Sequence, residues 1–210
     1  MWKDLSVEWK RTFENAWKAF RQGSIPIGAM ITDKSGHVII EGRNETCETH
    51  YPNKRTAHAE MYCVRNLDIE KYPDFNEYQL YTTMEPCPMC MGTIVMGGIR
   101  HIHVAARDKY CGALHYAQDD PYMKSKNLQI YMAAEELGEV QMVQQSYHEI
   151  RRHQGEESKV LKEFKKDYPR ATELAMKLYE ERYFDKCIKN NTLYSEVYDS
   201  ICKKLGYDKA

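Results

Sequence analysis

The stretch YTTMEPCPMCMGTIV, residues 81–95, contains the motif PCPMC at residues 86–90. One proline precedes the first cysteine and another follows it, so a strand is expected to end here and a helix to begin. The spacing of Cys87 and Cys90 suits two ligands of one metal ion. A structural zinc site usually has four protein ligands, so the remaining ligands must come from elsewhere in the chain.

A second segment, TAHAEMYC at residues 56–63, supplies a histidine and a glutamate. His58, Cys87 and Cys90 together make three protein ligands, and three ligands with an open fourth position are typical of catalytic zinc. Glu60 need not bind the metal, because a carboxylate beside a zinc-bound water can carry a proton from that water to a leaving group. Hydrolytic deamination of an amidine-like ring carbon requires this proton transfer.

The length and composition are those of an ordinary folded protein. The 210 residues suit one domain with an appendage or two small domains. Hydrophobic residues make up 42% and charged residues 29%, so a sizeable core can form. Lys and Arg number 30 against 31 Asp and Glu, a formal net charge of -1. The lack of a basic excess counts against a polyanionic partner, although a local basic patch would be hidden in this average.

The N-terminal segment alternates charged residues with Trp and Phe and has no apolar run of signal-peptide type. No window of the chain approaches a membrane-spanning length. The count of seven cysteines is odd, and we expect a cytoplasmic protein with reduced thiols. The five cysteines outside the motif are then expected to be mostly buried or inert thiols.

Hydrophobic periodicity predicts alternating helices and strands. Helices are expected over 3–22, 58–67, 86–98 and 119–138, and strands over 25–32, 37–43, 78–84, 101–106 and 139–147, with a loop at 44–57. A helix between the fourth and fifth strands implies a crossover, so these two strands should be parallel. The predicted fold class is therefore α/β, with a five-stranded mixed sheet in a three-layer α-β-α arrangement.

The chain changes character after about residue 150. Residues 156–206 show little strand pattern, and their apolar residues recur at near-helical spacing. Two or three amphipathic helices are expected, broken near Pro169 and Asn190–Asn191. We predict a first domain at 1–150 and a C-terminal helical extension at 151–210, either packed on the core as an appendage or used for dimerisation.

The paired motifs resemble a known family. Zinc-dependent nucleobase deaminases of the cytidine and deoxycytidylate deaminase superfamily carry H-x-E followed by P-C-x-x-C, which here read HAE at 58–60 and PCPMC at 86–90. The segments IPIGAMIT, EGRN, TAHAE, YTTMEPCPMCMGTIV and AARDKYCGA are similar, in order, to bacterial tRNA adenosine deaminases, guanine deaminases and fungal-type cytosine deaminases. The resemblance covers roughly residues 5–147 and implies a cytidine-deaminase-like fold.

This resemblance also implies roles for individual residues. His58, Cys87 and Cys90 would bind one Zn²⁺ per chain, Glu60 would shuttle the proton, and substrate contacts would come from Asn44, the backbone N–H of Ala59, Ile27, Gly28 and Asp108. Asn44 could instead be a turn residue, and Asp108 could serve only loop hydrogen bonding. His50, His115 and Tyr116 are further candidates for the pocket mouth. The run IRRH at 150–153 is either a phosphate contact or a solvated charged face.

The zinc chemistry leaves the substrate open. We favour a free nucleobase, nucleoside or related small heterocycle, with a purine-like ring, because the branch that this chain resembles handles mostly purines. Adenosine-to-inosine conversion in tRNA is the alternative, and Lys54, Arg55 and Lys124 keep it open. Against tRNA, the loop before HAE is longer than in typical tRNA enzymes, and the only basic pair in the region after the fifth predicted strand is Arg151–Arg152.

A non-catalytic protein on the same fold is a third possibility. Relatives are commonly dimers, so we predict a homodimer.

Overall fold

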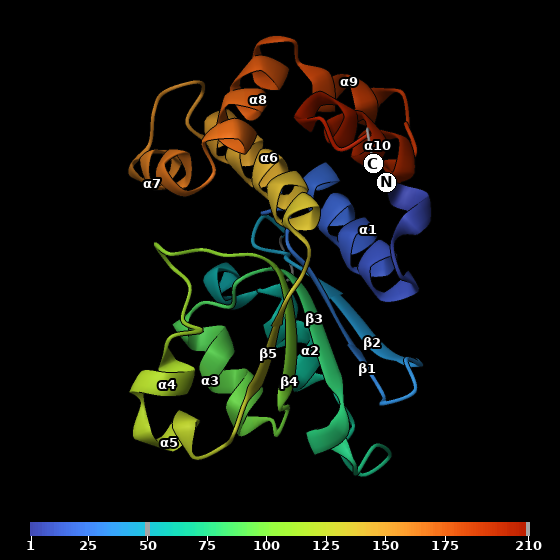
Figure 1. The fold of residues 1–210 in the computed structure, drawn as a ribbon, viewed down its shortest axis with the longest axis vertical. Coiled ribbons are helices and arrows are strands. Elements are labelled where there is room, and N and C mark those ends of the chain that lie inside the picture. Colours follow the sequence, from blue (N-terminus) through green and yellow to red (C-terminus); the bar gives the residue numbers. More distant parts are fainter. Residues whose placement is uncertain (49–50, 209–210) are drawn as a thin grey trace.

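A mixed sheet of five strands forms the centre of the computed structural model, which describes residues 1–48 and 51–208 (Figure 1). In chain order the strands are β1 (Gly28–Thr32), β2 (Val38–Arg43), β3 (Gln79–Met84), β4 (His101–Ala106) and β5 (Gln129–Met132). They lie in the order β2-β1-β3-β4-β5. β1 pairs antiparallel with β2 and β3, whereas β3 with β4 and β4 with β5 are parallel. The predicted mixed sheet with parallel fourth and fifth strands is confirmed.

Helices cover both faces of this sheet. They are α1 (Val7–Arg21), α2 (Ala59–Arg65), α3 (Pro88–Met96), α4 (Tyr116–Asp119), α5 (Pro121–Lys124) and α6 (Glu135–Arg152), with short 3-10 turns η1 (Trp2–Asp4), η2 (Lys54–Thr56) and η3 (Phe75–Glu77). α2 and α3 share one apolar cluster with the sheet, and α1 and α6 contribute to a second cluster. The predicted three-layer α-β-α fold is therefore confirmed.

Four helices follow α6 where two or three were predicted. They are α7 (Lys159–Asp167), α8 (Pro169–Glu180), α9 (Tyr183–Lys189) and α10 (Tyr194–Leu205). The predicted breaks near Pro169 and Asn190–Asn191 are present, and a further break falls at Arg182, whose backbone is left-handed with φ 53°. None of the helices within the described ranges combines the length and the hydropathy that a membrane span requires.

The C-terminal helices pack on the opposite side of α1 and α6 from the sheet (Figure 1). Phe184 of α9 is fully buried and lies 5.8 Å from Trp17, 5.5 Å from Phe20 and 4.6 Å from Tyr147, measured between ring centroids. One apolar cluster thus joins α1, α6 and the C-terminal helices. Whether residues 151–210 form a separate domain stays a prediction.

Two predicted elements were wrong. Residues 139–147 form the middle of α6 and not the fifth strand, which lies at β5 within the helix predicted over 119–138. Asp120 and Pro121 do start a helix, as their capping signals predicted, but α5 ends after four residues. β5 is an edge strand with mostly exposed residues, so it shows no alternation of apolar and polar side chains.

A strand was predicted within α6 because this helix is buried on every side from Leu137 to Ile150. All residues from Leu137 to Ile150 are buried, so the helix lacks the amphipathic period that identifies a surface helix. Two of its glutamines find internal partners: Gln141 donates to the Pro26 carbonyl at 2.8 Å, and Gln144 donates to the Tyr194 hydroxyl at 2.9 Å. Gly138 is required by packing, since a Cβ there would lie 2.9 Å from the Ala105 carbonyl oxygen.

The shared apolar cluster predicts cooperative unfolding of the whole chain. Truncating Phe184 to Ala should lower the free energy of unfolding by about 3–5 kcal/mol, since it leaves a cavity against three aromatic rings. Urea unfolding followed by fluorescence and circular dichroism should show one coincident transition. Leu193→Ala is the control, because Leu193 is 66% exposed and its loss should change stability little. Two separate transitions, or an unchanged midpoint for Phe184→Ala, would contradict a shared core.

Candidate active site

The starts of α2 and α3 meet beside the C-terminal end of β3, which pairs with the start of β1. His58 is the N-cap of α2 and Cys87 is the N-cap of α3, and neither side chain makes a capping hydrogen bond. Pro88 occupies the first position of α3, where a proline needs no amide partner, and this places Cys90 in the first turn. Both N-cap side chains are therefore free to point at one another and at Cys90.

The three side chains have the spacing of a zinc site. Nδ1 of His58 lies 3.7 Å from Sγ of Cys87 and 3.5 Å from Sγ of Cys90, and the three atoms lie within 4.8 Å of one another. Tetrahedral zinc with ordinary Zn–N and Zn–S bonds separates such nitrogen and sulfur ligands by about 3.6 Å. The cluster therefore fits one zinc ion per chain, with three protein ligands as predicted.

The charge state of the thiols agrees with metal binding. A hydrogen bond from Cys90, together with the contact to His58, lowers the pKa of Cys87 to about 4 despite partial burial. The Cys87 thiolate in turn raises the pKa of Cys90, and burial adds to this shift. For His58, burial opposes protonation, but the hydrogen bond to Cys87 and the negative charge of Glu60 raise its pKa. A cation in the cluster would replace these protons.

Glu60 lies against the same cluster. Its carboxylate is 3% exposed, with one oxygen 3.5 Å from Sγ of Cys90 and the other accepting a hydrogen bond of 3.0 Å from Oγ1 of Thr82. Burial raises the pKa of Glu60, which makes the carboxyl a better proton carrier than an exposed glutamate. Thr82 on β3 fixes the orientation of this carboxylate, and sequence reasoning had not singled Thr82 out.

Asn44 follows the end of β2 and is fully buried. Its Oδ1 accepts hydrogen bonds from the amide and hydroxyl of Thr46, whereas Nδ2 has no partner among the described residues. A buried donor without a partner costs roughly 1–3 kcal/mol, so a ligand carbonyl or ring nitrogen here would recover that cost. Ala59 occupies the first position of α2, where the backbone N–H has no partner within the helix.

Ile27 and Gly28 were predicted to form a pocket wall, but the structure explains Gly28 by helix packing. Gly28 is buried, and a Cβ there would lie 2.1 Å from the Thr12 carbonyl oxygen and 2.6 Å from the Ala16 nitrogen. Close packing of α1 on β1 therefore requires glycine, whether or not a ligand approaches it. Ile27 accepts a backbone hydrogen bond from Asn44 at 2.9 Å, so the two predicted contact segments are joined. Substrate contact by either residue stays a prediction.

Asp108 lies in the loop that follows β4. Its Oδ1 accepts hydrogen bonds from the amides of Tyr110 and Cys111, which is the loop role kept as its alternative. The loop is tied to the metal motif by Glu85, which is 5% exposed and accepts from the amides of Asp108 and Leu114 at 3.0 Å each. A substrate role for Asp108 stays a prediction.

Glu85 was missed by sequence reasoning. It also pairs with Arg107 at 2.9 Å. One buried carboxylate directly before the metal motif thus holds three donors of the loop that follows β4. The available signal was a carboxylate placed between a buried strand and Pro86, where an unpaired charge would be costly.

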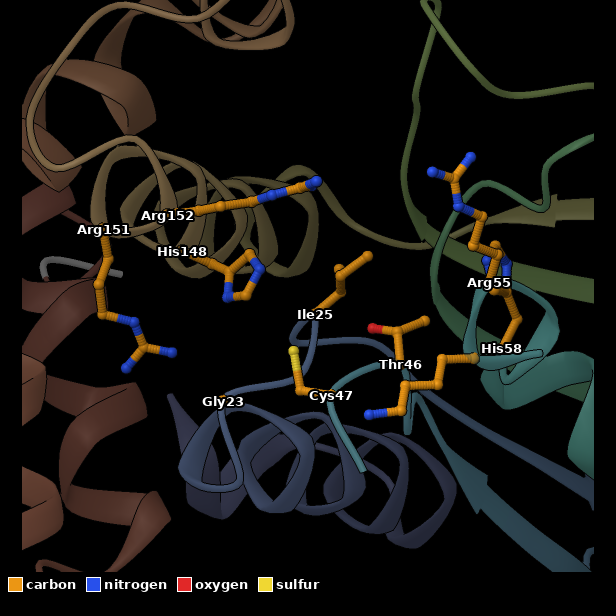
Figure 2. Close-up of a pocket in the computed structure, with 10 residues that line it drawn as sticks. Gly23, Ile25, Thr46, Cys47, Arg55, His58, His148, Arg151 and Arg152 are labelled. Carbon is orange, nitrogen blue, oxygen red and sulfur yellow. The ribbon is translucent and has the colours of Figure 1, made fainter. Parts of the chain in front are cut away.

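A cavity of about 750 Å³ opens beside His58 (Figure 2). Its walls come from α6, the segment after α1 and the loop before α2, and they include Lys54, Arg55, Arg151 and Arg152. Arg151 and Arg152 belong to the run predicted as either a phosphate contact or a solvated face. Lys54 and Arg55 are two of the three residues that kept the tRNA alternative open, and the third, Lys124, does not line this cavity. His115 and Tyr116 do not line this cavity, and His50 lies outside the described residues.

Comparisons with known proteins agree with this geometry. The family model described as the cytidine and deoxycytidylate deaminase zinc-binding region matches residues 7–106. A tRNA-specific adenosine deaminase from Aquifex aeolicus is 31% identical over 135 residues, which cover 62% of this chain and 87% of that protein. A tRNA-specific adenosine deaminase from Haemophilus influenzae is 39% identical over 103 residues, covering 48% of this chain and 57% of that protein. This chain thus spans little more than half the length of the Haemophilus enzyme.

Two further similarities come from other proteins. A cytosine deaminase from Candida albicans is 28% identical over 99 residues, covering 47% of this chain and 64% of that enzyme. A solved structure from a study of A-to-I editing by tRNA:A34 deaminases has a TM-score of 0.51 and 27% identity, covering 60% of this chain and 96% of that one. The chain belongs to the cytidine and deoxycytidylate deaminase family, whose members named here are deaminases.

Replacing one ligand should remove the metal. Purified protein should contain about one zinc per chain, and Cys90→Ala should contain well under half of that after dialysis, because two protein ligands hold zinc poorly. Elemental analysis by mass spectrometry measures this directly. Cys63→Ala is the matched control, since Cys63 is equally buried but lies outside the cluster. Full zinc in Cys90→Ala would show that these residues are not the ligands.

Weakening the Glu85 anchor should loosen the loop that follows β4. In Glu85→Gln the charge that faces Arg107 is lost, and hydrogen bonds to a charged group typically contribute about 1.5–3 kcal/mol. Hydrogen–deuterium exchange in residues 107–114 should therefore accelerate about tenfold or more, while zinc content is retained. The exposed Glu77→Gln serves as the control. Unchanged exchange in this loop would refute the anchoring role.

Proposed function

We propose that this chain is a zinc-dependent hydrolytic deaminase that replaces the exocyclic amino group of a nucleobase-type ring with oxygen and releases ammonia. The observation that carries the proposal is Glu60, a buried carboxylate within 3.5 Å of the metal-ligand cluster that is not itself part of the ligand set. A purely structural metal site has no use for such a group, because burying an uncompensated carboxylate is costly.

Glu60 carries the protons of the reaction. Zinc in this site would supply a Lewis acid that lowers the pKa of water to near neutrality. Glu60 takes a proton from the attacking water and delivers it to a ring nitrogen while oxygen bonds to the amino-bearing carbon. The second proton of the water then goes to the amino group, the carbon–nitrogen bond breaks, and ammonia leaves. Water is consumed, ammonia is released, and Glu60 returns to its starting state.

Other groups of the chain hold the reactants in place. Thr82 keeps one oxygen of Glu60 fixed, so the other oxygen faces the cluster. Nδ2 of Asn44, which has no partner among the described residues, and the N–H of Ala59, which has none within α2, are two donors suited to the edge of a heterocycle. Such fixed donors favour a flat ring with acceptor atoms on one edge.

The substrate that we favour is a small molecule with a purine-like ring. α6 forms one wall of the cavity beside His58 (Figure 2), and the helices that follow pack behind α6 (Figure 1), which limits the space for a large partner. The formal net charge of -1 also gives no general basic surface of the kind that polyanion binding uses. The relative named as a cytosine deaminase supports a small substrate.

Adenosine-to-inosine conversion in tRNA is the second candidate. The relatives from Aquifex and Haemophilus are named for tRNA adenosine deamination, and the basic side chains around the cavity suit a phosphate group.

The homodimer and the cytoplasmic location both stay predictions. A sedimentation experiment that shows a monomer at micromolar concentration would contradict the dimer.

The decisive variant is Glu60→Gln. It should lose activity by about 10²–10⁴-fold, which is the usual contribution of a positioned general acid–base group, while keeping its zinc. Ammonia release is measured over adenine, guanine, cytosine, their nucleosides and nucleotides, and a tRNA anticodon stem-loop. Glu156→Gln, a change at an exposed carboxylate, should keep full activity.

Each outcome of this panel separates the candidates. Unchanged activity of Glu60→Gln would refute the proton-transfer role. Activity on the stem-loop alone would replace the small-molecule substrate with tRNA. A zinc-loaded wild-type protein that releases ammonia from no compound would favour the non-catalytic alternative.

A further inference from the structure

The cavity beside His58 carries more positive charge than deamination of a neutral base requires. None of the described residues that line it is acidic, whereas four are Lys or Arg. Because the whole chain has a formal charge of -1, this concentration of cations does not reflect its composition. Like charges that share a cavity repel one another, so the arrangement is most stable when an anion lies between them.

The cations come from two segments that are far apart in the chain. Lys54 and Arg55 lie in η2, just before the metal ligand His58, and Arg152 lies at the end of α6. Figure 2 shows Arg152 extending from α6 across the cavity toward the side that carries Arg55. Within residues 1–48 and 51–208, none of these three side chains forms an ion pair, so their charges are available to a ligand.

The same cavity wall holds a partly fixed arginine and a buried histidine. The Arg151 guanidinium packs over the Phe20 ring at 4.2 Å and lies 3.8 Å from an oxygen of Asp185, which orients it. His148 is 6% exposed, and its Nδ1 has no hydrogen-bond partner among the described residues. Burial and the neighbouring Arg151 and Arg152 lower the pKa of His148 to about 4, so it is neutral near pH 7 and the arginines supply the charge.

The helix dipole explains only part of this concentration of basic residues. Basic residues in the last turn of a helix interact favourably with its dipole, which accounts for Arg151 and Arg152 at the end of α6. It does not account for Lys54 and Arg55, which approach the cavity from a different segment. Their position directly before His58 ties the basic cavity to the metal cluster.

We propose that this cavity binds the phosphate of a nucleotide substrate whose base lies at the metal cluster, so that the enzyme acts on a nucleoside monophosphate. The inference rests on the proposed deaminase function and specifies its substrate class. Arg152 and Lys54 bind the phosphate oxygens from opposite walls, and Arg55 adds a guanidinium suited to two parallel hydrogen bonds with phosphate.

A mononucleotide fits the cavity better than a nucleic-acid strand does. The volume of about 750 Å³ lies within the range of roughly 300–1,000 Å³ that is usual for small-molecule sites. Polynucleotide binding gains most of its affinity from many phosphate contacts along a basic surface. Here the cations concentrate in one cavity beside the metal ligand, which suits a single phosphate.

The test compares matched pairs that differ only in phosphate. Adenosine, guanosine and cytidine are measured against their 5′-monophosphates, both for kcat/KM of ammonia release and for binding by calorimetry. The best monophosphate should exceed its nucleoside by about tenfold or more, and this ratio should fall about tenfold in Arg152→Ala and in Lys54→Ala, because each loses one charge-assisted contact. Lys71→Ala, at an exposed cation beyond the far end of α2, should keep the ratio.

The two readouts separate this inference from the proposed function. Ammonia release with equal preference for nucleoside and monophosphate, in wild type and both variants, would overturn the phosphate site and leave the deaminase standing. Tighter monophosphate binding that is lost in Arg152→Ala, without ammonia release from any compound, would support the phosphate site and refute the deaminase. An anticodon stem-loop that is deaminated faster than every monophosphate would overturn the choice of a mononucleotide.

Discussion

The structure depends on one constraint, which is that two helices begin at the same point. His58 and Cys87 are N-cap residues, the positions at which a side chain normally satisfies the free amides of its own helix. Here both side chains turn away from that role and toward Cys90 and each other. A zinc ion at this point would neutralise two neighbouring thiolates, so metal binding and the packing of α2 against α3 would support one another.

α6, which packs on the other face of the sheet, brings Arg151 and Arg152 to the cavity beside His58. α6 is buried from Leu137 to Ile150, yet it carries glutamines whose partners are the Pro26 carbonyl, before β1, and the Tyr194 hydroxyl, on α10. These hydrogen bonds fix the helix along its length, so its final turn reaches the cavity beside His58. Asp185 of α9 lies 3.8 Å from Arg151 and so helps to hold that side chain beside the cavity. A helix outside the matched family region, α6, thus forms one wall of the cavity beside His58.

The sequence predicted those features that depend on local chemistry. The clustering of His58, Cys87 and Cys90, the position of Glu60 beside them and the proline-directed start of α3 follow from residue type and spacing, and the first four strands lie close to their predicted limits. The predicted secondary structure was wrong in α6, where burial on all sides removes the hydrophobic periodicity of a helix. It was also wrong in β5, an edge strand without the alternation of a half-buried strand. The surroundings of Thr82 and His148 could not be read from the sequence, because both depend on partners distant in the chain, whereas Glu85 left one signal, a carboxylate between a buried strand and Pro86.

If the enzyme is a zinc deaminase, three protein ligands hold the zinc and leave one position for water beside Glu60. X-ray absorption at the zinc edge of the purified protein measures this ligand set. We expect two sulfur ligands near 2.3 Å and two lighter ligands near 2.0–2.1 Å, one with the multiple-scattering pattern of imidazole and the other without it. Three or four sulfur ligands, or a second imidazole, would refute an open zinc site, since a closed set of protein ligands leaves no position for the attacking water.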